Sequence, residues 1–334
     1  MLYGRSGGRN FGRSAIGGIG GFIGTAKTLR GGPTSKTQKQ FAGNAAFGGL
    51  KMVIKQNKIL INPTYRCQLD CPYCDYKVST KESAELGYPQ IKAFEKMPRI
   101  KKELTATQWH THLNKFRPYL LEVSGGEPTQ YFDIIELLDR VPADSRWAMT
   151  SNTLRHDVIE KIDFSKCISW TSSYHHRFDE LFFQGLETVK SKWGRYPAVT
   201  LVLTKENLDK AMPKVFDFVK RGIPTNVHPY FGVGFDYHTA PELKGFIDTI
   251  KPFVHFVDCD WVNNTRFPVC RAGHNYFYAM PDGTLLRCYS HGFEGLVMGH
   301  ISEVVPNEGL SECNVDCRFP CDREIAQSPT VLRN

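Results

Sequence analysis

The segment RCQLDCPYCDYK, residues 66–77, decides how the rest of this sequence is interpreted. It places Cys67, Cys71 and Cys74 in the spacing C-x3-C-x2-C, directly after a β-rich run, KILINPTY (58–65). A tetrahedral zinc site usually takes four protein ligands, often as two C-x-x-C pairs. Three cysteines with no nearby fourth instead fit an iron–sulfur cubane that leaves one iron open. A structural zinc knuckle and a chance cluster are the alternatives.

Downstream of the cysteine loop, runs of strand character alternate with runs of helical periodicity. The predicted strands are 58–65, 119–124, 146–152, 167–174, 198–204 and 225–231. The predicted helices are 105–116, 131–141, 157–163, 179–193 and 207–222. This order predicts an α/β fold of βα repeats around a parallel sheet, closed into a full or partial barrel. Chemistry in such folds gathers at the carboxyl ends of the strands.

Unusual residues follow several of these predicted strands. SGGEPT (124–129) follows the second strand, TSN (150–152) ends the third, and SSYHH (172–176) ends the fourth. Paired glycines let a backbone approach a ligand closely, and a carboxylate beside them can accept hydrogen bonds from an ammonium group. Cys167, inside a predicted buried strand, is interpreted as a core residue.

The carboxyl-terminal part is rich in cysteine and lacks clear helical periodicity. Cys270 and Cys288 flank RAGHNYFYAMPDGTLLR, which predicts a hairpin with a Pro-Asp-Gly turn, so that both thiols lie at one end. Three further cysteines follow at even spacing: Cys313, Cys317 and Cys321.

The C-x3-C-x2-C loop, with Tyr73 before its third cysteine and a GGE segment after the second strand, resembles the radical S-adenosylmethionine (SAM) superfamily. The resemblance implies a partial (β/α)6 TIM-like barrel. It also implies a [4Fe–4S] cluster on Cys67, Cys71 and Cys74, whose open iron is chelated by SAM. An electron from the cluster cleaves SAM, and the resulting 5′-deoxyadenosyl radical abstracts hydrogen from a substrate.

The resemblance also suggests which residues bind SAM. Gly125, Gly126 and Glu127 stand where the family binds the amino group of SAM, and the polar strand ends are candidates for its ribose and carboxylate. The SAM-binding candidates are Tyr73, Gly125, Gly126, Glu127, Ser151, Asn152 and Ser173. His175 and His176 are expected to face the substrate or to be solvated loop residues.

The spacing Cys270-x12-Gly283-x4-Cys288 resembles the opening of the SPASM and twitch extensions of radical SAM enzymes. The chain departs from the full SPASM pattern because it lacks a C-x2-C-x5-C-x3-C block. One auxiliary [4Fe–4S] cluster is therefore expected, with a structural zinc site as the alternative. Its metal ligands would be four of Cys270, Cys288, Cys313, Cys317 and Cys321.

Charge and glycine content separate an amino-terminal arm from the rest of the chain. Residues 1–58 hold ten of the 42 basic residues and no acidic one, which leaves 32 basic against 34 acidic residues elsewhere. Residues 1–50 also hold 14 of the 29 glycines, which makes ordering costly. The expected division is a flexible arm (1–50), a core barrel (56–255), an auxiliary-cluster domain (256–325) and a tail (326–334).

No secretory signal or membrane span is evident in the sequence, so a cytoplasmic location with reduced thiols is expected. The resemblance implies SAM, a reductant such as flavodoxin or ferredoxin, and a peptide, protein or small-molecule substrate. Peptide or protein modification is the leading expectation. The basic arm leaves modification of a nucleotide or RNA open, with nucleic acid as a partner. A non-catalytic zinc-binding adaptor is the rival from another class.

Overall fold

A computed structural model describes residues 57–71, 74, 102–204, 207–229, 241–254, 256–257, 269–289, 296–307 and 309–312. All of them belong to the compact unit of residues 55–334. The predicted arm and tail, together with Tyr73, Cys313, Cys317 and Cys321, lie outside the described residues.

Strands and helices alternate through most of this unit. The strands are β1 (Asn57–Ile61), β2 (Tyr119–Val123), β3 (Arg146–Ser151), β4 (Cys167–Tyr174), β5 (Ala198–Leu203), β6 (Thr225–Pro229), β7 (Phe256–Val257), β8 (Val269–Cys270), β9 (Tyr276–Ala279), β10 (Thr284–Leu286), β11 (Val297–His300) and β12 (Ser311–Glu312). The α-helices are α3 (Ala106–Leu113), α4 (Ile134–Asp139), α5 (His156–Ile159), α6 (Asp179–Trp193), α7 (Leu208–Lys220) and α8 (Pro241–Ile250). Short 3-10 helices are η2 (Asn114–Phe116), η3 (Pro128–Gln130) and η4 (His176–Phe178).

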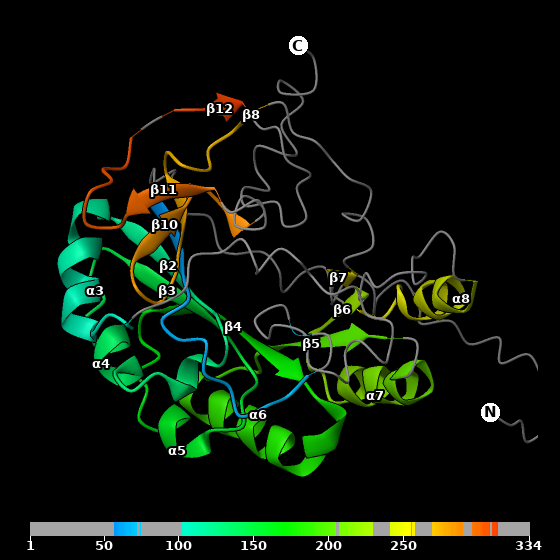
Figure 1. Ribbon diagram of the computed structural model, residues 1–334. Coiled ribbons are helices and arrows are strands. Elements are labelled where there is room, and N and C mark those ends of the chain that lie inside the picture. Colours follow the sequence, from blue (N-terminus) through cyan, green and yellow to red (C-terminus); the bar gives the residue numbers. More distant parts are fainter. Residues whose placement is uncertain are drawn as a thin grey trace, which may run out of the picture. The chain divides into compact units, whose positions relative to one another are not determined.

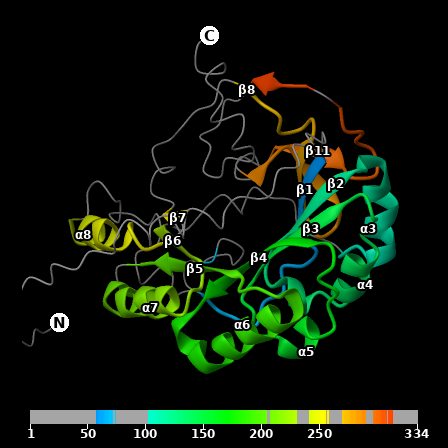
Figure 2. The ribbon, with the colours of Figure 1, turned by 180° about the vertical axis from the view of Figure 1, so that it is seen from behind.

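Within the described residues, ten strands form one sheet in the order β11-β10-β9-β1-β2-β3-β4-β5-β6-β7. Strands β1 to β7 are parallel, and each crossover moves the chain by one strand. Helices α3 to α8 lie along one side of this sheet in both ribbon views (Figure 1, Figure 2). The parallel βα arrangement is that of a partial TIM-like barrel, as the sequence predicted.

The two faces of the sheet differ in character. In β2 the alternate residues Tyr119, Leu121 and Val123 are buried and pack with residues of α3 and α4 in one apolar cluster. The residues between them, Leu120 and Glu122, point to the opposite side and stay half-buried. Because side chains alternate along a strand, this second face is separate from the helix-packed core.

The second face carries polar side chains on five neighbouring strands, which is unusual because parallel sheets commonly bury both faces in apolar residues. Lys58 and Glu122 form an ion pair across β1 and β2, with Nζ and Oε1 2.9 Å apart. Further polar residues of this face are Thr150, Thr171, Ser173 and Thr200. This face of the sheet therefore presents hydrogen-bonding groups on the side away from the helices.

Local sequence explains several helix boundaries. Helix α3 begins after Thr105, whose hydroxyl accepts from the Gln108 N–H while the Gln108 side chain accepts from the Thr105 N–H. This reciprocal capping box satisfies two donors that a helix start otherwise leaves open. Helix α6 ends at Gly194, whose φ of 78° lies in the left-handed region that favours glycine.

The carboxyl-terminal hairpin joins the barrel sheet. The predicted Pro-Asp-Gly turn is confirmed: β9 and β10 are antiparallel, and Gly283 has φ +82°. Strand β9 also pairs in parallel with β1, so the hairpin extends the sheet on the far side of β1 from β2. The expected domain boundary at residue 256 stays a prediction. The sequence analysis did not predict α8 or this pairing of β9 with β1.

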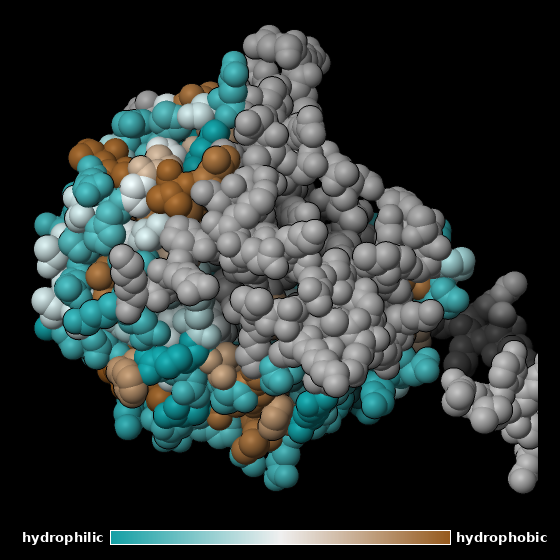
Figure 3. Space-filling view, viewed as in Figure 1, coloured by the Kyte–Doolittle hydropathy of each residue, from teal (hydrophilic) through white to brown (hydrophobic). Residues whose placement is uncertain are grey.

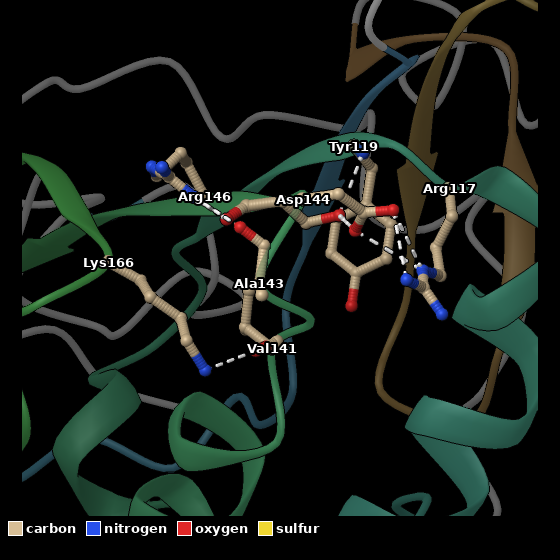
Figure 4. Close-up of polar contacts among 8 residues, drawn as sticks. Arg117, Tyr119, Val141, Ala143, Asp144, Arg146 and Lys166 are labelled. Atoms are coloured by element: carbon tan, nitrogen blue, oxygen red, sulfur yellow. Dashed lines mark hydrogen bonds and ion pairs between the residues drawn. The ribbon is translucent and has the colours of Figure 1, made fainter.

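Polar contacts order the turns that precede β2 and β3 (Figure 4). The Arg117 guanidinium faces the Asp144 carboxylate, with its Nη2 2.9 Å from Oδ2. Ser145 accepts from the Tyr119 N–H and donates to Asp144. The Arg117 hydrogen bond holds the pKa of Asp144 below its usual range. We call Arg117, Asp144 and Ser145 the amino-end network.

The edge strand β11 exposes apolar side chains. Leu296, Val297 and Met298 are at least 40% exposed, and hydrophobic residues gather over this strand in the space-filling view (Figure 3).

Among the helices of the described ranges, none is long and apolar enough to cross a bilayer.

Candidate functional site

The cysteine loop begins where β1 ends, at the carboxyl ends of the parallel strands. From β1 the chain crosses the ends of the neighbouring strands toward the end of β4 (Figure 1, Figure 2). Cys67, Cys71 and Cys74 are half-buried, and the Cys74 N–H donates to the Cys71 carbonyl over 3.1 Å. The thiols therefore sit at the end of the sheet where catalytic residues of such folds gather.

Arg66 anchors the chain immediately before Cys67. Its Nη2 lies 2.7 Å from the Glu103 carboxylate, and its Nε donates to the Thr64 hydroxyl over 3.1 Å. The guanidinium also stacks 4.1 Å from the centre of the Phe132 ring. Three partners thus fix the residue that leads into the loop.

Gly125 and Gly126 pack against the same segment from the end of β2. A Cβ atom on Gly126 would lie 2.5 Å from the carbonyl oxygens of both Tyr65 and Arg66, which no larger residue tolerates. The N–H groups of Gly126 and Glu127 donate to the Thr64 and Arg66 carbonyls. Gly125 adopts φ +121°, which also favours glycine. The two glycines therefore join the end of β2 to the start of the cysteine loop.

The Glu127 carboxylate is buried and bound entirely by protein donors. Oε1 accepts from the Thr129 N–H (3.0 Å), the Thr129 hydroxyl (2.6 Å) and the Ser151 hydroxyl (2.8 Å), and Oε2 accepts from the Asn152 N–H (2.6 Å). Burial raises the pKa of Glu127, and these hydrogen bonds offset part of that rise. The carboxylate links the ends of β2 and β3.

The network continues from β3 into β4. Ser151 accepts from the Thr153 N–H, and the Thr153 hydroxyl donates to Ser172 over 2.7 Å. Thr153 has φ 63°, a left-handed conformation that is uncommon outside glycine. Gly185 of α6 permits it, because a Cβ there would lie 2.0 Å from the Thr153 carbonyl oxygen. We call Glu127, Ser151, Thr153 and Ser172 the carboxyl-end network.

Asn152 and Ser173, two predicted SAM contacts, occupy different surroundings. The Asn152 amide accepts from Gln68 and from the Leu154 N–H, and its Nδ2 is 4.0 Å from Cys67 Sγ. Ser173 lies on the second face of the sheet and is half-buried. Asn152 therefore borders the cysteine loop, Ser173 borders the polar face, and the Ser151 hydroxyl is turned into the carboxyl-end network.

The two histidines after β4 also differ. His175 Nδ1 lies 3.3 Å from Cys71 Sγ. His176 stacks edge-on against Tyr174, with ring centres 4.8 Å apart. Burial, with a smaller contribution from His176, lowers the pKa of His175 to about 4. Burial also lowers the pKa of His176. His175 therefore faces the cysteine loop rather than open solvent.

The described residues of the loop are compatible with an iron–sulfur cubane. Among the described residues, no three His, Cys, Asp or Glu side chains converge as the ligands of one ion must. Thiolates of a cubane bind separate irons and need not converge on one point. Nitrogen atoms already contact two of the sulfurs: the Leu69 N–H donates to Cys67 Sγ over 3.4 Å, and His175 Nδ1 lies 3.3 Å from Cys71 Sγ. N–H donors to the sulfurs are a usual feature of iron–sulfur sites.

Cys270 and Cys288 meet in a small cluster with Ala272 and Tyr276. The hairpin brings them together, and β12 pairs with β8 so that Ser311 lies opposite Cys270. Arg287 donates to the carbonyls of Ala272, Ser311 and Glu312, at 2.9, 3.1 and 2.8 Å. One side chain thus connects the segment before Cys288 to the segment that leads toward Cys313.

The sequence analysis missed three features of the site. It gave Glu127 a ligand-binding role and did not foresee its contacts with Ser151 and Asn152. It did not include Arg287, although this residue directly precedes Cys288. It considered His175 only as a substrate-facing or solvated residue, and its place one residue after β4 was the available signal.

Comparison with known proteins identifies the fold. No protein-family model matches the chain, and no curated protein sequence matches it. Solved structures do match. SuiB from Streptococcus suis, bound to S-adenosylmethionine, has a TM-score of 0.51 and 17% identity over 74% of this chain and 64% of its own. Native anSMEcpe with bound AdoMet has a TM-score of 0.51 and 12% identity over 74% of this chain and 78% of its own. This chain thus spans less than two thirds of SuiB and shares the fold of both proteins.

Proposed function

We propose that this chain is a radical SAM enzyme with an iron–sulfur cluster on Cys67, Cys71 and Cys74. The observation that carries the proposal is the packing of Gly125 and Gly126 on the backbone that enters the cysteine loop. It joins two motifs, separated by some 50 residues of sequence, at the carboxyl ends of adjacent parallel strands. Two proteins with this fold, SuiB and anSMEcpe, bind SAM.

When bound, the cluster and SAM together supply a carbon radical that takes a hydrogen atom from the substrate. The chain's own residues hold and orient these groups. We infer that the backbone carbonyls of Gly125 and Gly126 accept from the ammonium group of SAM, and that the Glu127 carboxylate, which accepts from the Asn152 N–H, holds this segment from the buried side. Asn152, beside the loop, and Ser173, on the second face, are the residues that would hold the remainder of SAM.

An auxiliary [4Fe–4S] cluster is the second part of the proposal. Cys270 and Cys288 lie in one cluster of side chains and supply two thiolates. Cys313, Cys317 and Cys321 are the candidates for the other two. Arg287 holds the segment that precedes Cys313, because it donates to the carbonyl of Glu312.

A peptide or protein is the proposed substrate. The second face of the sheet offers hydroxyl groups and one ion pair, which suit a polar, hydrogen-bonding ligand. An electron donor such as flavodoxin or ferredoxin is proposed as the partner that reduces the cluster.

The test is anaerobic reconstitution of the full chain with iron and sulfide. We expect about eight irons per chain, and 5′-deoxyadenosine formed from SAM and dithionite. A variant with Cys67, Cys71 and Cys74 all changed to Ala should hold about four irons and form no 5′-deoxyadenosine.

Other outcomes separate the parts of the proposal. About four irons that fall to none in the triple variant would refute the auxiliary cluster and keep the SAM site. Bound zinc without iron or 5′-deoxyadenosine would refute the enzyme. Candidate peptides whose mass changes only with SAM and reductant would support the substrate class, and unchanged mass across them would count against it.

A further inference from the structure

The contact between His175 and Cys71 joins the cysteine loop to a strand far along the chain. The two residues are 104 positions apart in sequence, and Nδ1 lies 3.3 Å from Sγ. His175 follows β4 directly, and its carbonyl accepts from the Phe178 N–H over 3.1 Å, which fixes the backbone at this point. The imidazole therefore reaches the loop from the short junction between β4 and η4.

The neighbours of His175 point to other surroundings, so the contact is specific to one side chain. Tyr174 is buried in the apolar cluster that includes Phe182 and Phe218. His176 packs over the Tyr174 ring. His175 alone of these three contacts a cysteine of the loop.

Cys67 and Cys71 receive different donors. The Cys67 sulfur accepts from the Leu69 N–H of its own loop, whereas the Cys71 sulfur contacts a side chain that directly follows β4. A hydrogen bond to a ligating thiolate withdraws charge from the sulfur and stabilises the reduced state of an iron–sulfur cluster. Such a bond is stronger where burial lowers the local dielectric.

We propose that His175 is a positioning residue that donates its Nδ1–H to the Cys71 thiolate, orients that ligand and raises the reduction potential of the cluster. The inference rests on the proposed function. It adds a role for a residue outside both the cysteine motif and the GGE segment.

Three substitutions of His175 separate hydrogen bonding from packing. Asn places an N–H donor near the position of Nδ1, Gln places one nearer Nε2, and Ala has none. The measurement is the midpoint potential of the SAM-binding cluster in the reconstituted full chain, by titration with dithionite followed by electron paramagnetic resonance. Addition of SAM identifies the signal of this cluster, because the auxiliary cluster does not bind SAM. His176→Ala is the matched control.

We expect His175→Ala and His175→Gln to reduce the ratio of reduced to oxidised cluster about tenfold at a fixed potential, which is about 59 mV for one electron. His175→Asn should restore most of the wild-type potential, and His176→Ala should leave it unchanged. Equal iron and sulfide content in all variants shows that the site is assembled.

An unchanged potential in His175→Ala would overturn the inference, as would equal shifts in the Ala and Asn variants. Loss of the cluster from both His175→Asn and His175→Ala would also overturn it, because the contact would then be needed for assembly alone. A wild-type protein without a SAM-responsive signal would instead refute the proposed function itself. The two failures are thus distinguishable.

Discussion

The two ends of the parallel sheet both carry polar networks, but these networks differ in how far their side chains are exposed to solvent. At the carboxyl ends, Glu127, Ser151, Thr153 and Ser172 are each no more than 2% exposed and bond to one another. At the amino ends, Ser145 is buried, but the charged pair of the network is not: the Arg117 and Asp144 side chains are 43% and 45% exposed. The buried network adjoins the cysteine loop, whereas the exposed one orders two turns.

The two networks should contribute differently to the free energy of unfolding. A buried polar group whose partner is removed loses about 1–3 kcal/mol, whereas an exposed ion pair contributes about 0–1 kcal/mol. The carboxyl-end network is therefore sensitive to single substitutions, and the site it supports should fail with it. The amino-end network should tolerate change.

Gly126→Ala should have the largest effect. Its Cβ would lie 2.5 Å from two carbonyl oxygens, so either the β2 end or the cysteine loop must move. We expect a loss of about 2 kcal/mol or more in the free energy of unfolding, together with loss of about four irons on reconstitution. Gly245→Ala in α8 is the control, because its Cβ meets nothing within 4 Å. Normal iron content in Gly126→Ala would contradict the joining role of this glycine.

Glu127→Ala should follow closely. It removes the acceptor of four hydrogen bonds and leaves the Asn152 N–H and the Ser151 hydroxyl buried without their partner. Urea unfolding should show a loss of about 2 kcal/mol in the free energy of unfolding. Glu122 lies in β2, and its 28% exposed carboxylate pairs with Lys58. Glu122→Gln should therefore lower the free energy of unfolding by less than about 1 kcal/mol. Similar losses in the two variants would remove the contrast between buried and exposed carboxylates.

At the carboxyl end of the sheet, the motifs could be predicted from the sequence, but the contacts between their side chains could not. The spacing of Cys67, Cys71 and Cys74 is local, so it can be read without knowing the fold. The SGGEPT segment was placed correctly after a strand. The hydrogen bonds of the Glu127 carboxylate to Ser151 and Asn152 depend on β3 lying beside β2. No local sequence pattern indicates these donors.

Strand and helix positions were predicted because apolar periodicity is strong where one face of an element is buried. Helix α6 was predicted to the residue, whereas α4 and α5 are shorter than the predicted runs. The parallel pairing of β9 with β1 was not predicted, because it joins segments about 220 residues apart and carries no local signal.

Thiol reactivity offers a third test of the two ends. Cys167 begins β4 at the amino end, is buried in the core and has its pKa raised to about 12 by that burial. At pH 8 its thiolate fraction should be about one part in ten thousand. In metal-free folded protein, iodoacetamide should label Cys67, Cys71 and Cys74 well before Cys167, measured by peptide mass spectrometry. Urea should make Cys167 reactive, and equal labelling in folded protein would contradict its burial.

Asp144→Asn should have the smallest effect, because both partners of the Arg117 ion pair are exposed. The folded-state pKa of Asp144 lies below its ordinary value, so the ionised carboxylate stabilises the fold above that value. This contribution is lost as the pH falls through the folded-state pKa. Thermal unfolding of Asp144→Asn at pH 7 should therefore occur slightly below that of the wild type, and the difference should vanish in strong acid. A large loss at pH 7, or a change in iron content, would show that the amino-end network supports the site as the carboxyl-end network does.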